Sequence, residues 1–174
     1  MVWCFPLVTS LALLALTTLA SAKDDVYQKP SAFLAEVFGG RIPKSGAIRL
    51  TGAHQGEIKR IMGHAYGSKR VRYWSDRRRT VWILEEIGKT KPITVGYVVA
   101  GGNIERVKVL IYRESHGWEV RQPFFTKQFR GARLASGTKL TKRIDNIAGA
   151  TLSVRALTKM GKLALYLEGR RSGE

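Results

Sequence analysis

The sequence predicts an α+β fold: a single domain with an antiparallel sheet flanked by helices, following an N-terminal apolar segment. Apolar and polar residues alternate in neighbouring runs between Thr80 and Glu114, which is typical of strands. After Thr151 the apolar residues recur every three or four positions, which is typical of an amphipathic helix. Because strands follow one another and helical patterns stand at the two ends, α+β is the expected class.

Residues 1–22 form the first expected unit. They contain no charged side chain, Leu7 to Ala20 is an apolar run, and Ala20-Ser21-Ala22 has the small-residue spacing of a cleavage site. This pattern predicts a secretory signal peptide and an exported, periplasmic protein. An uncleaved membrane anchor is the alternative, because a helix of this length reaches about 33 Å. The single cysteine, Cys4, lies in this segment, so cleavage would leave no thiol for catalysis or disulfides.

Residues 23–79 form an N-terminal helical and basic region of the domain. A helix is expected over residues 31–38, with Ser31 as N-cap and two glycines after its last residue. A short strand is expected over residues 48–50. A helical turn is expected over residues 56–63, with Ile58, Ile61 and Met62 facing inward.

The stretch from Tyr66 to Arg79 interleaves six basic side chains with three aromatic ones. The whole chain has a formal net charge of +17, which implies an acidic partner, an anionic ligand or an anionic surface. Nucleic acid is not favoured as a partner of an exported protein. A docking face for an acidic protein or for lipid headgroups is favoured. A solvated strand pair joined by a Ser75-Asp76 turn is the alternative.

Residues 80–168 form the expected core of the domain. Two runs with period-2 alternation flank a turn at residues 100–103. Their alternating apolar positions are Val95, Tyr97, Val99, Val107, Val109 and Ile111. Val98, Leu110 and Tyr112 are apolar on the opposite face, so helices are expected on both sides of part of the sheet.

Residues 145–153 read as a tight turn of small residues that leads into the C-terminal helix. Gly149 and Ala150 leave the backbone and the Thr151 hydroxyl accessible. A helix N-terminus offers free N–H groups and a positive dipole, which suit a phosphate. Nearby Lys142, Arg143, Arg155 and Lys159 add positive charge. The plain alternative is that Thr151 serves as an N-cap and the stretch only starts a helix.

The pattern Asp145-x-x-x-Gly149-Ala150-Thr151-x-Ser153 resembles the flavinylation motif of the FMN-binding domain family. That family includes the flavin-carrying subunits of Nqr/Rnf-type respiratory complexes and exported single-domain flavoproteins. The resemblance extends over roughly residues 94–160. It includes a polar loop at Glu114–Gly117 and an F-x-x-Q-F-x-G segment, in which Phe125, Gln128, Phe129 and Gly131 match.

The resemblance implies an electron-transfer flavoprotein that carries FMN on Thr151 through a phosphoester bond made by a flavin transferase. The donor would be a membrane redox system and the acceptor a cytochrome or another reductase. The expected cofactor-binding residues are Asp145, Gly149, Ala150, Thr151, Leu152, Ser153, Glu114, His116 and Gly117. No metal site is expected, because the three histidines lack ligand spacing.

Two other functions remain open from the residues alone. One is a flavin-dependent reductase with its own small substrate, for which His116 is the candidate acid. The other is a basic surface-binding protein without flavin.

Overall fold

The computed structural model describes residue 1, residues 25–135 and residues 138–171. The expected signal or anchor segment therefore lies outside the described residues, apart from Met1. None of the helices in residues 25–135 and 138–171 has the length and hydropathy that a bilayer crossing requires.

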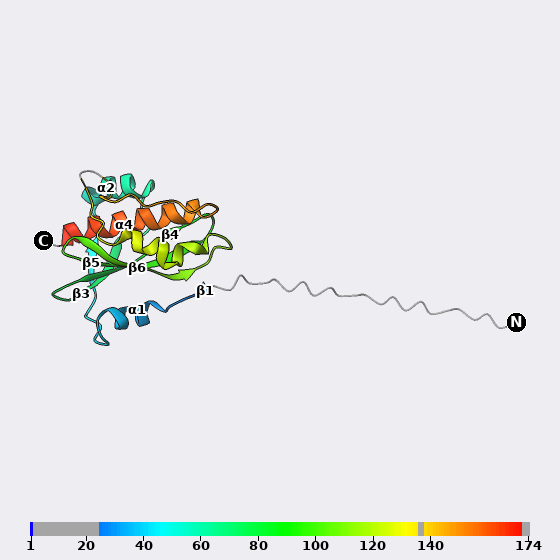
Figure 1. Cartoon of the computed structure of the whole chain (residues 1–174), viewed down its shortest axis with the longest axis horizontal. Helices are drawn as coiled ribbons and strands as arrows, with labels where there is room; N and C mark the ends of the chain where they lie inside the picture. The colour runs from blue at the N-terminus through cyan, green and yellow to red at the C-terminus, as the bar shows by residue number, and fades with distance from the viewer. Residues whose placement is uncertain (2–24, 136–137, 172–174) are drawn as a thin grey trace.

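The described residues form an α+β fold around one six-stranded antiparallel sheet, as the alternating runs predicted (Figure 1). The strand order is β1-β6-β5-β4-β3-β2. The strands are β1 (Asp25–Val26), β2 (Gly46–Arg49), β3 (Arg70–Ser75), β4 (Thr80–Ile87), β5 (Pro92–Ala100) and β6 (Asn103–Tyr112). The three strands β4, β5 and β6 are consecutive in the chain and pair with one another through short hairpins, which local alternation specifies well.

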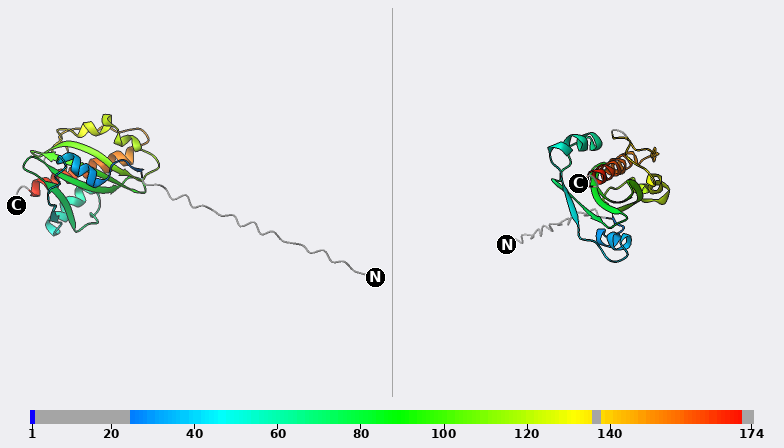
Figure 2. Two further views of the ribbon diagram at one scale, coloured as in Figure 1. Left: turned by 90° about the horizontal axis from the view of Figure 1, so that it is seen from below. Right: turned by 90° about the vertical axis from the view of Figure 1, so that its left-hand side faces the viewer.

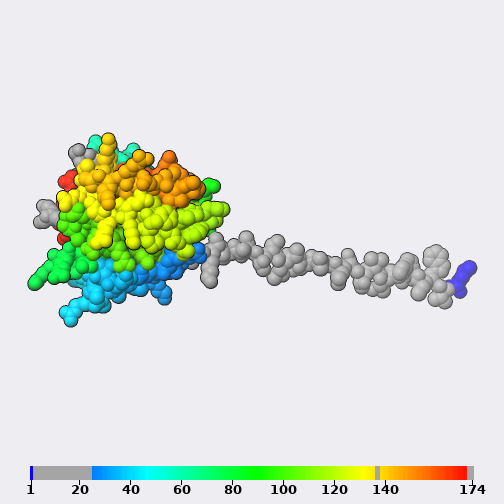
Figure 3. All heavy atoms as spheres, in the orientation of Figure 1, coloured from blue at the N-terminus to red at the C-terminus, as the bar shows by residue number. Residues whose placement is uncertain are grey.

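Helices cover both faces of the sheet, as expected (Figure 2). On one face, Phe33 and Leu34 of α1 (Pro30–Val37) pack with Val81, Val98 and Leu110 in a small core. The other face carries the long helix α4 (Thr151–Arg171), against which α2 (Gly52–Met62) packs. The short helices η1 (Trp118–Arg121), α3 (Pro123–Thr126) and η2 (Lys127–Phe129) lie beside β6. In the space-filling view, the stretch that precedes α4, coloured yellow to orange, forms an outer layer of the molecule (Figure 3).

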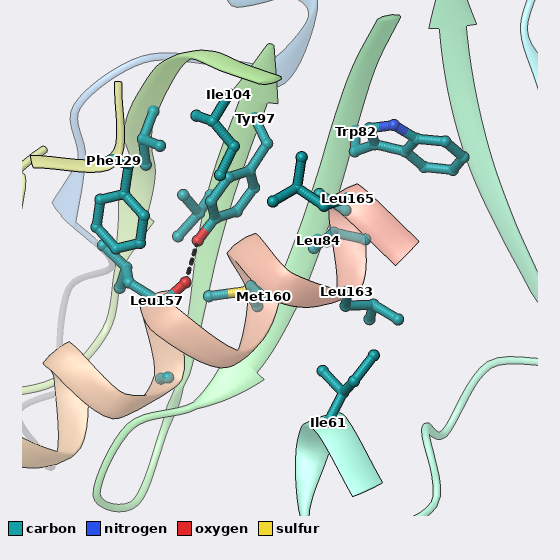
Figure 4. Close-up of a cluster of buried hydrophobic side chains, with 14 of the residues drawn as sticks. Ile61, Trp82, Leu84, Tyr97, Ile104, Phe129, Leu157, Met160, Leu163 and Leu165 are labelled. Carbon is teal, nitrogen blue, oxygen red and sulfur yellow. Dashed lines mark hydrogen bonds between the residues drawn. The ribbon is translucent and has the colours of Figure 1, made fainter. Parts of the chain in front are cut away.

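The main core lies between α4 and the sheet (Figure 4). Leu157, Met160 and Leu163 of α4 are fully buried against the sheet side chains. The Tyr97 hydroxyl donates a 2.7 Å hydrogen bond to the Leu157 carbonyl, which fixes α4 along β5. Because protein cores are close-packed, these buried side chains hold α4 rigidly against the sheet.

Two sequence-based expectations about the fold were wrong in detail. Ser31 is not the N-cap of α1: the helix begins at Pro30, whose fixed φ suits the first helical position, and Lys29 occupies the cap. Tyr112 does not share the face of Leu110. Thr94 pairs with Ile111 but Val95 pairs with Val109, so a β-bulge at Leu110 reverses the facing of the residues after it. Tyr112 therefore lies in the main core, on the α4 side.

Candidate functional site

Three segments meet at the N-terminal end of α4 and enclose a cavity of about 450 Å³. The turn between β4 and β5 contributes Lys89, and the loop after β6 contributes residues 114–116. The third wall is residues 149–153, which are the end of the small-residue turn and the start of α4. This volume lies within the range of pockets that bind organic cofactors.

The turn before α4 is held by contacts to its backbone. The Gln128 side-chain oxygen accepts a 2.7 Å hydrogen bond from the Asp145 N–H. Within the turn, the Ala150 N–H donates to the Ile147 carbonyl over 3.0 Å. Gly149 has a φ of +80°, a left-handed conformation that side chains with a Cβ rarely adopt. Gln128 therefore links the F-x-x-Q-F segment to the turn, which sequence spacing alone did not reveal.

Thr151 is the first residue of α4 rather than its N-cap. The Val154 N–H donates to the Ala150 carbonyl over 2.9 Å, so Ala150 occupies the cap position. The N–H groups of Thr151, Leu152 and Ser153 come before this first helical bond and have no earlier helical carbonyl to bind. Thr151 lines the cavity, and its hydroxyl accepts a 2.9 Å hydrogen bond from the Asn146 side-chain amide.

Ser153 is in a different environment from Thr151. Its side chain is 4% exposed, and its hydroxyl forms a 2.9 Å hydrogen bond with the Tyr112 hydroxyl. The Tyr112 hydroxyl also donates a 2.6 Å hydrogen bond to the His116 carbonyl. Burial raises the pKa of Tyr112 to about 12, so this phenol stays protonated near neutral pH. Tyr112 thus connects β6, the loop after β6 and the start of α4. The sequence gives no signal for the bulge that turns Tyr112 toward the cavity.

Gly117 lies directly behind this network and does not line the cavity. A Cβ on Gly117 would lie 2.9 Å from the Tyr112 hydroxyl oxygen and 3.0 Å from that of Ser153. The Ala150 Cα would be 3.3 Å away. The loop can therefore approach the start of α4 this closely because residue 117 has no side chain, and its φ of +87° also favours glycine.

Glu114 lines the cavity, but its carboxylate holds the β4–β5 turn. One oxygen accepts hydrogen bonds from the N–H groups of Lys89, Thr90 and Lys91, at 2.5, 2.6 and 2.9 Å. Burial alone would raise the pKa of this carboxyl, yet the three N–H donors lower it overall. Glu114 therefore keeps a wall of the cavity in place as a carboxylate.

His116 and Leu152 present side chains to the cavity. His116 is exposed, and the hydrogen bond of its ring is to the neighbouring Ser115 hydroxyl at 2.9 Å. Leu152, the second residue of α4, is 43% exposed. It offers an apolar surface at the cavity mouth.

The charged residues near the turn are arranged differently from the sequence expectation. The Asp145 side chain is exposed, pairs with Arg143 at 3.4 Å and does not line the cavity. Lys142 bonds the Arg130 carbonyl at 2.7 Å, and none of the four expected cations is in the cavity wall. Among the described residues, the lysine in that wall is Lys89, which is far away in sequence.

The aromatic residues of the F-x-x-Q-F segment are core residues. Phe125 and Phe129 are fully buried and pack edge to face, with ring centres 5.6 Å apart. They do not line the cavity, so they support the site from behind.

Comparison with known families adds a decisive observation to this geometry. Residues 88–166 match the FMN-binding domain, a range that spans all three walls of the cavity. This part of the chain is an FMN-binding domain. The match makes FMN the implied cofactor and indicates a flavin-binding redox protein. Neither the curated proteins nor the solved structures contain a match to the chain.

The cavity residues fit an FMN phosphate and ring. The unpaired N–H groups at the start of α4 and the Lys89 ammonium favour an anion, and Leu152 offers apolar contact. The FMN-binding domain thus has, at the start of α4, a site of suitable size and chemistry for its cofactor.

Proposed function

We propose that Thr151 carries FMN covalently, through a phosphoester bond to its hydroxyl, and that the protein is an exported electron-transfer flavoprotein. One contrast supports Thr151 as the acceptor. Thr151 is half-buried and its hydroxyl has one side-chain donor, Asn146, whereas Ser153 is buried and its hydroxyl is bonded to Tyr112. The geometry therefore favours Thr151 among the two hydroxyls of the motif.

The attachment is a phosphoryl-group transfer from FAD, carried out by a separate flavin transferase. The Thr151 oxygen forms a bond to the phosphorus on the FMN side of the pyrophosphate. The pyrophosphate P–O bond breaks, AMP leaves, and the hydroxyl proton passes to the transferase or to water. On this chain, the Asn146 amide holds the Thr151 oxygen in place, and Gly149 leaves the turn open to the approaching enzyme.

The bound flavin supplies one- and two-electron redox chemistry, and the protein binds and orients it. Covalent attachment suits a protein outside the cytoplasm, where a dissociated cofactor would be lost. The export proposal rests on the apolar run Leu7–Ala20 and on the Ala20-Ser21-Ala22 sequence that follows.

The position of β1 bears on where a redox partner would contact the domain. Asp25 pairs with Tyr112, whose hydroxyl bonds Ser153 beside the cavity. The chain therefore enters the fold at the same end as the cofactor site (Figure 1). A membrane attachment that preceded Asp25 would hold the Thr151 end toward a membrane redox protein.

The test is co-expression with a flavin transferase, followed by intact mass and in-gel flavin fluorescence under denaturing conditions. We expect the label on the wild type and on Ser153→Ala, and its loss in the near-isosteric Thr151→Val. Far-UV circular dichroism of Thr151→Val checks that the fold is kept. A labelled Thr151→Val protein would refute the assignment, and turnover of a small substrate by the labelled protein alone would replace the carrier role by a reductase.

A further inference from the structure

A cavity of about 830 Å³ lies away from Thr151, at the C-terminal end of α4. Its walls are the β3–β4 turn, the β5–β6 turn, residues 133–134 and the last turns of α4. Since α4 rises about 1.5 Å per residue, its residue 169 lies roughly 25 Å along the axis from residue 152. This cavity is called the arginine cleft below.

The arginine cleft is strongly basic, and its cations come from separate parts of the chain. Among the described residues its lining cations are all arginines, with no lysine: Arg77, Arg78, Arg79, Arg133, Arg170 and Arg171. A helix C-terminus attracts cations, but this effect reaches only its own last turn. It does not account for the arginines of the β3–β4 turn.

Among the described residues, the two acids that line the cleft, Asp76 and Glu168, are occupied by structural contacts. Asp76 accepts hydrogen bonds from the backbone N–H groups of Arg78 and Arg79 at 2.7 and 2.8 Å, which close the β3–β4 turn. Glu168 is 8% exposed and accepts from Thr80, Trp82 and Arg171. The acids in the cleft therefore hold the fold and do not neutralise all of its arginines.

Four of the cleft arginines form no ion pair among the described residues: Arg77, Arg78, Arg133 and Arg170. Arg133 instead donates a hydrogen bond to the Asn103 side-chain oxygen. Arg77 and Arg78 are exposed with no ion pair, and Arg170 stacks on the Tyr166 ring with its guanidinium carbon 5.3 Å from the ring centre. By contrast, Arg79 lies 3.6 Å from Glu105, and Arg171 lies 2.6 Å from Glu168. A ligand with several negative charges would meet guanidinium groups that are not already paired.

The lining between the arginines suits an extended chain. Leu134, Leu165 and Tyr166 give the cleft apolar contact surface, and Gly101 and Gly102 leave one wall without side chains. A Cβ on Gly102 would meet no atom within 4 Å, so this wall is open. Guanidinium groups bind carboxylates through two parallel hydrogen bonds, and they desolvate more easily than ammonium groups.

We propose that the arginine cleft binds an acidic segment of a partner protein, in which carboxylates pair with Arg77, Arg78 and Arg170. A flat anionic membrane fits less well, because these groups line a hollow with apolar surface. The segment would bind roughly 25 Å from the cofactor site, so the cleft would tether a partner without holding its redox centre against the flavin. This proposal is independent of flavin attachment.

The test measures binding of a fluorescein-labelled peptide rich in Glu and Leu, by fluorescence anisotropy, to the purified protein without flavin. The cleft variant is Arg77→Gln/Arg78→Gln/Arg170→Gln. The control variant, Arg41→Gln/Lys44→Gln/Arg49→Gln, removes the same charge from exposed residues in and before β2 that do not line the cleft. We expect the cleft variant to bind at least about tenfold more weakly, and the control variant to change binding by less than about threefold.

Equal weakening in both variants would show that only the net charge matters and would overturn the proposal. Unchanged binding in the cleft variant would overturn it as well. Vesicles containing anionic lipid serve as the competing probe: if they bind through these arginines while the peptide does not, the surface is a lipid-docking site instead. Since the protein carries no flavin in this assay, these outcomes are separate from any failure of Thr151 labelling.

Discussion

Replacing Gly117 by alanine should test how the loop after β6 supports the start of α4. The substitution has two costs. A φ of +87° costs a residue with a Cβ about 1–2 kcal/mol. The new Cβ would also lie 2.9 Å from the Tyr112 hydroxyl and 3.0 Å from that of Ser153, and overpacking of this kind costs about 1–3 kcal/mol. The free energy of unfolding should therefore fall by about 2–5 kcal/mol.

Gly40 provides the matched control for this substitution. It has the same φ of +87°, and a Cβ there would meet no atom within 4 Å. Gly40→Ala should therefore lower the free energy of unfolding only by the cost of the positive φ, about 1–2 kcal/mol. Urea denaturation of both variants measures the difference, which isolates the contact with Tyr112 and Ser153.

The same pair of variants has a functional readout. The crowded Cβ also faces the Ala150 Cα at 3.3 Å, so relief of the contact would move the residue before Thr151. We expect flavin labelling to drop in Gly117→Ala and to stay unchanged in Gly40→Ala. Equal unfolding free energies for the two variants, with equal labelling, would refute the packing argument.

Two further predictions concern side chains away from the cavity. Gln128→Ala removes the acceptor for the Asp145 N–H and should slow flavin labelling of Thr151 with little loss of stability. Gln128→Glu keeps an acceptor and should restore the labelling rate. Equal labelling time courses for the wild type and Gln128→Ala would disprove this role. The Ala65 carbonyl, and next the Glu86 carboxylate, raise the pKa of His64. The contribution of the His64–Glu86 pair to the free energy of unfolding should be fully present below the usual histidine pKa of about 6.5. It should be lost as the pH rises through the higher pKa of His64 in the folded state. Comparing the pH dependence of unfolding in the wild type and Glu86→Gln would show it, and identical profiles would count against it.

The strands and helices were predictable because their signals are local. Period-2 alternation specified β5 and β6 and their turn, and the three-four spacing after Thr151 specified α4. The bulge at Leu110 was not predictable, because one extra residue in a strand leaves the composition of the run unchanged. That single residue decides whether Tyr112 faces α1 or the cofactor site.

The site was predictable as a motif but not as a set of contacts. The residues around Thr151 share one short segment, so the turn and helix start could be located from sequence. Glu114 bonds residues that lie 23 to 25 positions earlier in the chain, and Lys89 reaches the cavity through that contact. Such pairings depend on the sheet register, which spacing in one segment does not specify. For the same reason, the hydrogen bond between the Asp145 N–H and the Gln128 side chain could not be predicted from the sequence.

The sequence also grouped residues that the fold separates. The basic run from residue 69 to residue 79 was expected to act as one docking face. Arg70 and Arg72 project from β3 and line a different hollow, while Arg77 to Arg79 line the arginine cleft. Successive side chains of a strand point to opposite faces of the sheet, whereas those of a turn do not follow this alternation. One basic run therefore contributes to two surfaces.

Helix α4 links the cofactor site and the arginine cleft mechanically. Its first turn lines the Thr151 cavity and its last turns line the cleft, while Leu157, Met160 and Leu163 are buried between them. A close-packed helix does not shorten or bend readily, so the two ends stay at a fixed separation. If both proposals hold, a partner tethered at the cleft must be large enough to span that separation before it can exchange electrons with the flavin. Substitutions in the cleft should then lower the association rate and leave electron transfer within the formed complex unchanged, whereas changes around Thr151 should do the reverse.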